Sequence, residues 1–95
     1  MLRTVQGDVL EIAITLCDIE LELVKKVVFE SKDLTIHQEA VEEDGVYRIR
    51  IEGEQTKDFN PGFAHYQIII TLADDQELTV KRSKMEVLRR ISADD

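Results

Sequence analysis

The sequence predicts an all-β protein, an antiparallel β-sandwich of about seven strands that forms a single domain over residues 1–91. Three observations favour this fold class. Apolar residues recur with a period of two, polar reversals separate these stretches every ~8–12 residues, and no stretch shows a long helical period. A chain of 95 residues is long enough for one core. We expect residues 92–95 to be a frayed C-terminal tail.

The first strands are predicted between residues 10 and 31. Apolar residues at 10, 12, 14 and 16 alternate with Glu11, Ala13 and Thr15, the pattern of a half-buried strand. Residues 18–24 fit either an alternating strand or a helical stripe, and the pattern does not decide between them. Residues 24–31 are rich in β-branched and aromatic side chains, so we interpret them as a strand.

The middle of the chain is predicted to form a hairpin. Alternation is weak over residues 34–38, and an acidic run that ends in Asp44-Gly45 follows it. An Asp-Gly pair is a strong two-residue turn signal, so the chain should reverse there. Tyr47, Ile49 and Ile51 then alternate with polar residues, which predicts a strand with one solvated face and favours antiparallel pairing.

The last third of the chain is predicted to contain a loop, a second hairpin and a final strand. Residues 56–62 carry Pro61-Gly62 and fit a tight turn. Alternation over residues 66–72, a polar reversal at Asp74-Asp75 and apolar residues at 78–80 predict the hairpin. The final stretch, residues 84–91, suits a strand or one face of a helix, and we favour the strand.

Composition excludes several classes of protein. Hydrophobic residues make up 43% of the chain and charged residues 34%, which is typical of a soluble globular domain. The net charge of −8 argues against a nucleic-acid partner. No apolar run approaches the ~20 residues of a membrane span, and the first residues lack the pattern of a secretion signal. The lone Cys17 cannot form an internal disulfide and has no zinc-ligand spacing around it, so we interpret it as a tolerated thiol.

Charge is unevenly distributed along the chain. Residues 1–80 hold seventeen acidic and seven basic side chains, whereas residues 81–95 hold three and five. The basic segment is either a docking strip for an acidic partner or the charged outer face of an edge strand that resists aggregation. Phe59 and Phe63 flank the Pro-Gly turn and either form an exposed apolar patch or plug one end of the sandwich. The candidate docking residues are therefore Phe59, Phe63, Lys81, Arg82, Lys84, Arg89 and Arg90.

No set of residues indicates catalysis, a metal or a cofactor. His37 and Glu39 would share one strand face, but two ligands do not make a metal site. His65 has no Ser or Cys placed as its nucleophile partner. The acidic runs at 42–44 and 74–75 lie in predicted turns, which Asp favours, and lack the ligand spacing of a calcium loop. We assign no catalytic, cofactor-binding or metal residue.

The order of these features resembles the immunoglobulin-like domain of phage tail and baseplate proteins, including the N-terminal domain of baseplate upper proteins. The resemblance spans most of the chain. It is carried by Gly-Asp-Val-Leu at 7–10, Asp-Gly-Val-Tyr at 44–47, Gln-Thr at 55–56, Pro-Gly at 61–62, Tyr-Gln-Ile-Ile-Ile at 66–70, Asp-Asp at 74–75, Leu-Thr-Val at 78–80 and Met-Glu-Val at 85–87.

This resemblance implies an immunoglobulin-like sandwich that is a structural part of a phage or prophage particle. It implies synthesis in a bacterial cytoplasm, a place in the virion, and docking to other virion proteins or to further copies of itself as a homo-oligomer. We therefore expect a non-enzymatic interaction domain. The alternative is a small ligand- or carbohydrate-binding module, although Trp, a common sugar-stacking residue, is absent.

Overall fold

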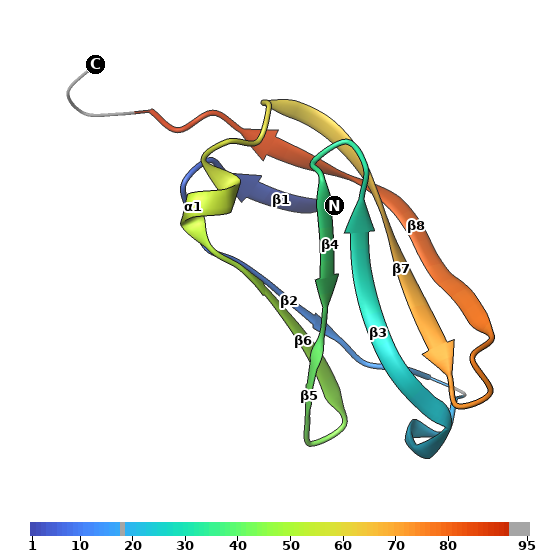
Figure 1. The fold of residues 1–95 in the computed structure, drawn as a ribbon. Coiled ribbons are helices and arrows are strands. Elements are labelled where there is room, and N and C mark those ends of the chain that lie inside the picture. The colour runs from blue at the N-terminus through green and yellow to red at the C-terminus, as the bar shows by residue number, and fades with distance from the viewer. Residues whose placement is uncertain (18, 92–95) are drawn as a thin grey trace.

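The computed structural model describes residues 1–17 and 19–91, which form two packed β-sheets (Figure 1). The five-stranded sheet has the order β1-β8-β7-β3-β4, and the three-stranded sheet has the order β2-β6-β5. The predicted all-β sandwich is therefore confirmed. The strands are β1 (Leu2–Val5), β2 (Leu10–Ile14), β3 (Val24–Ser31), β4 (Ile36–Glu39), β5 (Val41–Glu43), β6 (Val46–Ile51), β7 (Gly62–Leu72) and β8 (Glu77–Leu88).

The core lies between the two sheets and follows the alternation of the sequence. Along β6, Tyr47, Ile49 and Ile51 are buried while Arg48 and Arg50 are exposed. From the other sheet, β3 contributes Phe29, whose ring stacks on Tyr66 of β7 at a centroid distance of 5.1 Å. Residues of one strand thus alternate between core and solvent because successive side chains point to opposite faces.

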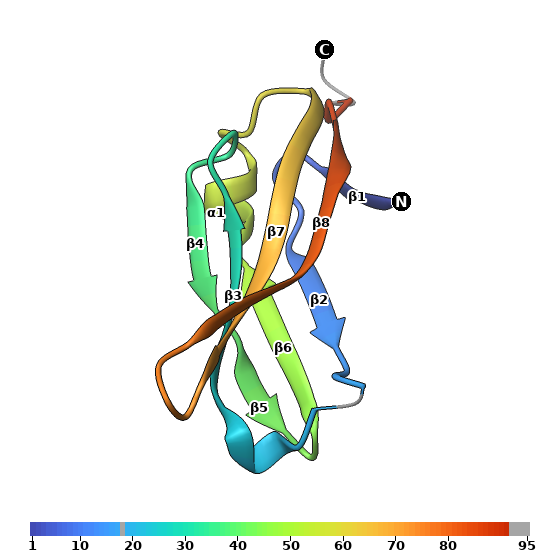
Figure 2. The same cartoon turned by 90° about the vertical axis from the view of Figure 1, so that its right-hand side faces the viewer.

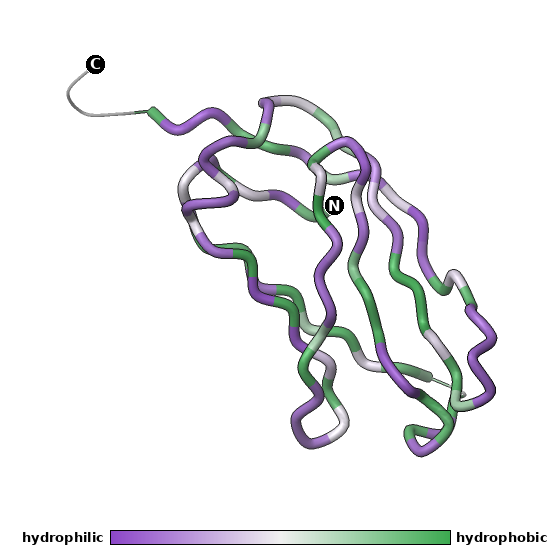
Figure 3. Tube along the Cα trace, in the orientation of Figure 1, coloured by the Kyte–Doolittle hydropathy of each residue, from purple (hydrophilic) through white to green (hydrophobic). Residues whose placement is uncertain are grey.

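Several predicted elements are confirmed. The strand over residues 24–31 is β3, and Asp44-Gly45 closes the β5–β6 hairpin with φ angles of 51° and 82°. Positive φ at both central residues is what a type I′ turn requires. The hydrophilic colour of this turn is visible in Figure 3. The final stretch continues as strand β8 to Leu88, as favoured over the helix.

The structure also differs from the prediction. Two strands were not predicted: β1 pairs parallel with β8 from Leu2↔Met85 to Val5↔Leu88, and β5 contains Glu42 and Glu43, which were expected in a turn. The stretches at 78–80 and 84–91, predicted as two strands, form one strand, β8. The four residues of β1 bury one side chain, the polar Thr4, so no apolar alternation marks them. The ambiguous stretch contains a short 3-10 helix, η1 (Leu21–Leu23), and a single helical turn, α1 (Gly53–Thr56), precedes the predicted loop. The predicted tail, residues 92–95, lies outside the described residues.

Thr56 of α1 connects this helix to the turn after β1 by hydrogen bonds. Its side chain is fully buried; the hydroxyl accepts the Gly7 N–H at 3.0 Å and donates to the Asp8 carbonyl at 2.7 Å. Gly53 lies so close that an added Cβ would come within 2.3 Å of the Gly7 carbonyl oxygen. A side chain at position 53 would therefore force the backbone of this turn to move.

Strands β7 and β8 form a long hairpin that dominates one side of the elongated molecule, which measures 51 × 24 × 20 Å (Figure 2). Pairing runs from Gly62↔Val87 to Thr71↔Glu77, and the register shifts between Ile68 and Ile69. Ile68 faces Lys81 and Ile69 faces Thr79, so Val80 is the extra residue of a β-bulge in β8.

Candidate docking surface

Polar side chains form a row across the outer face of the five-stranded sheet. The register places Arg82 of β8 opposite Gln67 of β7, Gln67 opposite Glu30 of β3, and Glu30 opposite His37 of β4. The Gln67 Nε2 donates to Glu30 Oε1 at 3.1 Å, and His37 Nδ1 lies 3.3 Å from Glu30 Oε2. Glu30 therefore interacts with both of its cross-strand neighbours, while Arg82 at the end of the row has no ion-pair partner among the described residues.

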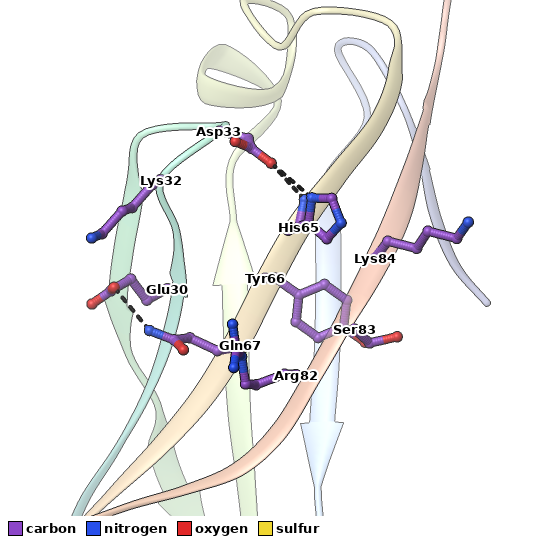
Figure 4. A pocket seen from close by; sticks show the side chains of 9 residues that line it. All are labelled: Glu30, Lys32, Asp33, His65, Tyr66, Gln67, Arg82, Ser83 and Lys84. Carbon is purple, nitrogen blue, oxygen red and sulfur yellow. Dashed lines mark hydrogen bonds and ion pairs between the residues drawn. The ribbon is translucent and has the colours of Figure 1, made fainter.

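A second row lies next to the first, where the β3–β4 turn approaches β7. Asp33 in that turn accepts the backbone N–H of His65 at 2.7 Å, and its Oδ2 lies 3.4 Å from His65 Nδ1 (Figure 4). This backbone hydrogen bond, with the nearby His65 ring, lowers the pKa of the Asp33 carboxyl below its usual value. Lys84 of β8 lies opposite His65 on the other side. Asp33 thus holds the β3–β4 turn against β7.

Together the two rows enclose an open groove of about 670 Å³. Three cations line it, Lys32, Arg82 and Lys84, and none of them has an ion-pair partner in residues 1–17 and 19–91. This is notable in a chain with a net charge of −8. We call this site the outer-face groove; its lining residues are Glu30, Lys32, Asp33, His65, Tyr66, Gln67, Arg82, Ser83 and Lys84 (Figure 4).

The two phenylalanines that flank the Pro-Gly turn are separated by the fold. Phe59 is buried, with 6% of its surface exposed, so it fills the core and is not available to a partner. Phe63, the second residue of β7, is 60% exposed, and the ammonium group of Lys84 lies 4.9 Å from its ring centroid. Phe63 and Lys84 therefore form one exposed cation–π pair beside the outer-face groove.

The predicted basic strip does not form one surface. Because side chains alternate along a strand, Lys81 lies on the same side of the sheet as Ile68, opposite to Arg82 and its partner Gln67. Arg90 lies beyond the end of β8 and makes an ion pair with Asp8, next to Gly7. Arg89 is exposed beside it. Of the five predicted cations, Arg82 and Lys84 belong to the outer-face groove.

Sequence reasoning did not identify Lys32, Glu30 and Gln67 as residues of this surface. Their alternation with buried neighbours was visible, since Phe29 and Ile68 face the core. What brings the three together is the β3–β7 register and the position of the β3–β4 turn, and neither is encoded in a local pattern. The pairing of residues 24–31 with residues 66–72 is the signal that could identify this surface, because it places Glu30 beside Gln67.

The histidines lie on this face, each beside one carboxylate. Within the described residues, no group of three or more His, Cys, Asp or Glu side chains is placed to hold a metal ion. Cys17 is exposed. No helix in the described part of the chain is long and apolar enough to cross a membrane.

Comparison with solved structures shows the fold. The extracellular domain of mouse leukocyte-associated immunoglobulin-like receptor 1, in a strand-swapped dimer, is similar over 92% of this chain and 86% of its own, with a TM-score of 0.59 and 17% identity. A putative glycoside hydrolase from Bacteroides vulgatus ATCC 8482 gives a TM-score of 0.49 at 10% identity and is covered over 17% of its length, which carries no argument. No protein-family model and no curated protein sequence matches the chain. The protein has an immunoglobulin-like β-sandwich fold.

Proposed function

We propose that this protein is a non-enzymatic interaction domain that binds an acidic segment of another protein subunit in the outer-face groove. The observation that carries the proposal is the convergence of Lys32, Arg82 and Lys84 without ion-pair partners among the described residues. Elsewhere in those residues, many cations are already matched: Arg3 with Glu86, Arg48 with Glu43, and Arg50 with Glu11 and Glu52. Unmatched cations on one face steer an anionic partner towards it and fix its register.

The neighbouring Phe63 supports a protein partner. An exposed aromatic ring beside charged groups is the mixture found at protein interfaces, where aromatic residues and Arg are enriched. The groove itself holds one aromatic residue, Tyr66, which is buried against Phe29 and so offers no exposed ring for sugar stacking. These features favour a peptide-like partner over the carbohydrate alternative.

The narrower form of the proposal is a structural role in a phage or prophage tail or baseplate, with other virion proteins as partners. It is supported by the ordered sequence resemblance alone. Mass spectrometry of particles purified after prophage induction in the source strain tests it. Detection of the chain in stoichiometric amounts is expected; its absence from the particles contradicts this narrower form and leaves the groove proposal standing.

Charge reversal tests the groove. We expect the double variant Arg82→Glu with Lys84→Glu to bind a fluorescein-labelled decaglutamate peptide roughly tenfold more weakly in fluorescence anisotropy, because two attractive pairs become repulsive. The matched control reverses the charges of Lys57 and Arg89, which are exposed and do not line the groove. Both variants carry the same net charge.

The control decides the outcome. If reversal of Lys57 and Arg89 weakens peptide binding as much as reversal in the groove, net charge governs binding and the groove proposal is wrong. Binding should also fall steeply as ionic strength rises, since exposed charges are screened within about 8 Å at physiological salt.

A further inference from the structure

Strand β2 is an unpaired edge of the three-stranded sheet. It pairs with β6 from Leu10↔Ile51 to Ile14↔Tyr47, and no other strand of the described chain pairs with it. Figure 2 shows β2 along the side of the molecule, below β1. One side of this strand therefore presents free backbone N–H and C=O groups, which form a template for a further strand.

Strand β2 lacks features that protect the edges at β4, β5 and the free part of β8. Strand β5 has three residues, and β4 has four with exposed His37 and Glu39. The free edge of β8, residues 77–84, carries the bulge and three basic side chains, Lys81, Arg82 and Lys84. Strand β2 carries a single charged residue, Glu11. Glu11 is already engaged by Arg50. Natural sheets use very short strands, bulges and Lys to prevent edge pairing, and β2, which has five residues, carries neither a bulge nor a Lys.

The core-facing side of β2 is incompletely covered. Leu10 is 5% exposed, but Ile12 and Ile14, on the same side of the strand, are half-buried and pack at the margin of the core. A strand added beside β2 would cover both isoleucines if it also carried apolar residues on that side.

The sequence of β2 is complementary to itself. In an antiparallel pair centred on Ile12, Leu10 lies opposite Ile14 of the second copy and Glu11 lies opposite Ala13 of the second copy. Apolar residues then meet on the core side, and no glutamate faces a glutamate on the solvent side. Like charges directly opposite would destabilise the pair, and this register avoids them.

We propose that β2 pairs antiparallel with β2 of a second copy across a two-fold axis, which joins the two three-stranded sheets into one continuous sheet. A two-fold contact of this kind closes on itself and yields a dimer instead of a filament. The outer-face groove lies on the other sheet, so the dimer leaves both grooves open to partners.

A charge introduced at position 13 has opposite effects on the monomer and on the proposed dimer. Ala13 is exposed and lies opposite Arg48 of β6 in the same molecule. In the variant Ala13→Glu, the new carboxylate is favourable beside Arg48 but meets Glu11 of the second copy, twice per dimer. We expect sedimentation velocity to show a dimer dissociation constant raised roughly fivefold or more.

The matched variant is Ala13→Lys, which is mildly unfavourable beside Arg48 and favourable beside Glu11 of the second copy. It should lower the dissociation constant or leave it unchanged, and thermal melts of both variants check that the fold is kept. A protein that stays monomeric up to millimolar concentration overturns the proposal. Shifts of the dissociation constant in the same direction for both variants overturn this register as well.

Discussion

The two halves of strand β8 have opposite environments. In residues 85–88, Met85 and Val87 are 0% and 2% exposed, and the strand is paired on both sides, by β7 and by β1. Residues 77–84 are exposed throughout and are paired on one side, by β7. Apolar side chains occur in both halves, since Leu78 and Val80 are 43% and 44% exposed.

This difference teaches that an apolar side chain of this hairpin is buried only where other parts of the molecule cover it, whatever its residue type. Ile70 is fully buried, yet Leu78, its partner on the same side of the sheet, is not. The flanking strand β1 reaches residues 85–88 and no further, so one half of β8 is an interior strand of the sheet and the other half is an edge, paired only with β7, which in turn pairs with β3.

The largest difference in the free energy of unfolding should appear when one apolar side chain is truncated in each half of β8. We expect Met85→Ala to lower the free energy of unfolding by about 2–5 kcal/mol, because it leaves a cavity in the core. Leu78→Ala should cost about 1 kcal/mol or less, since its side chain is already partly in water. Urea denaturation of both variants measures the difference; equal losses would mean that the two halves of β8 are equally part of the core.

A smaller effect should follow from loosening β1, which covers the buried half. Thr56→Val keeps the shape of the side chain but leaves the Gly7 N–H and the Asp8 carbonyl without their partner. We expect a loss of about 1–3 kcal/mol and faster amide exchange in β1 and in residues 85–88. Thr56→Ser, which keeps the hydroxyl, is the control. Exchange that rises instead in residues 77–84 would contradict the role given to β1.

The smallest effect is expected at the tip of the exposed half. Lys25 Nζ lies 2.6 Å from Asp75 Oδ1, and this hydrogen bond and charge lower the pKa of the Asp75 carboxyl below its usual value of 3.8. A lowered pKa in the folded state stabilises the fold above the unfolded-state pKa, and this stabilisation is lost as the pH falls through the folded-state value.

Asp75→Asn tests this contribution without straining the turn, because Asn also tolerates the positive φ of 67° at this position. We expect a Tm lower than that of the unsubstituted protein by a few degrees at most at pH 7, and a difference that shrinks as the pH falls below 3.8 and through the lowered folded-state pKa of Asp75. A Tm difference that persists in acid would assign the effect to the turn geometry instead of the ion pair.

Much of the fold could be predicted from the sequence because it is locally encoded. β-Branched and aromatic residues identified β3, alternation identified β6, and the Asp44-Gly45 turn fixed the hairpin that joins β5 to β6. Strand β1 could not be predicted in this way, since its pairing is non-local, parallel and supported by one buried residue, Thr4. The short helix α1 likewise depends on packing against the Gly7 turn.

The candidate surface was predicted in part. Charge identifies Arg82 and Lys84, but the alternation of side chains along β8 carries Lys81 to the opposite face. Phe59 and Phe63 were treated as one pair, and the fold buries the first and exposes the second. Lys32 joins the groove through the β3–β4 turn, which a local pattern does not place relative to β7.

The bulge at Val80 has a consequence for changes in chain length. Removing one residue from a regular strand turns every later side chain to the other face, which in β8 would exchange buried Met85 and Val87 with Glu86. Deleting Val80 instead removes the unpaired residue, so Lys81 and everything after it keep their faces and partners. The bulge is thus the place where β8 can lose a single residue while the core remains in register.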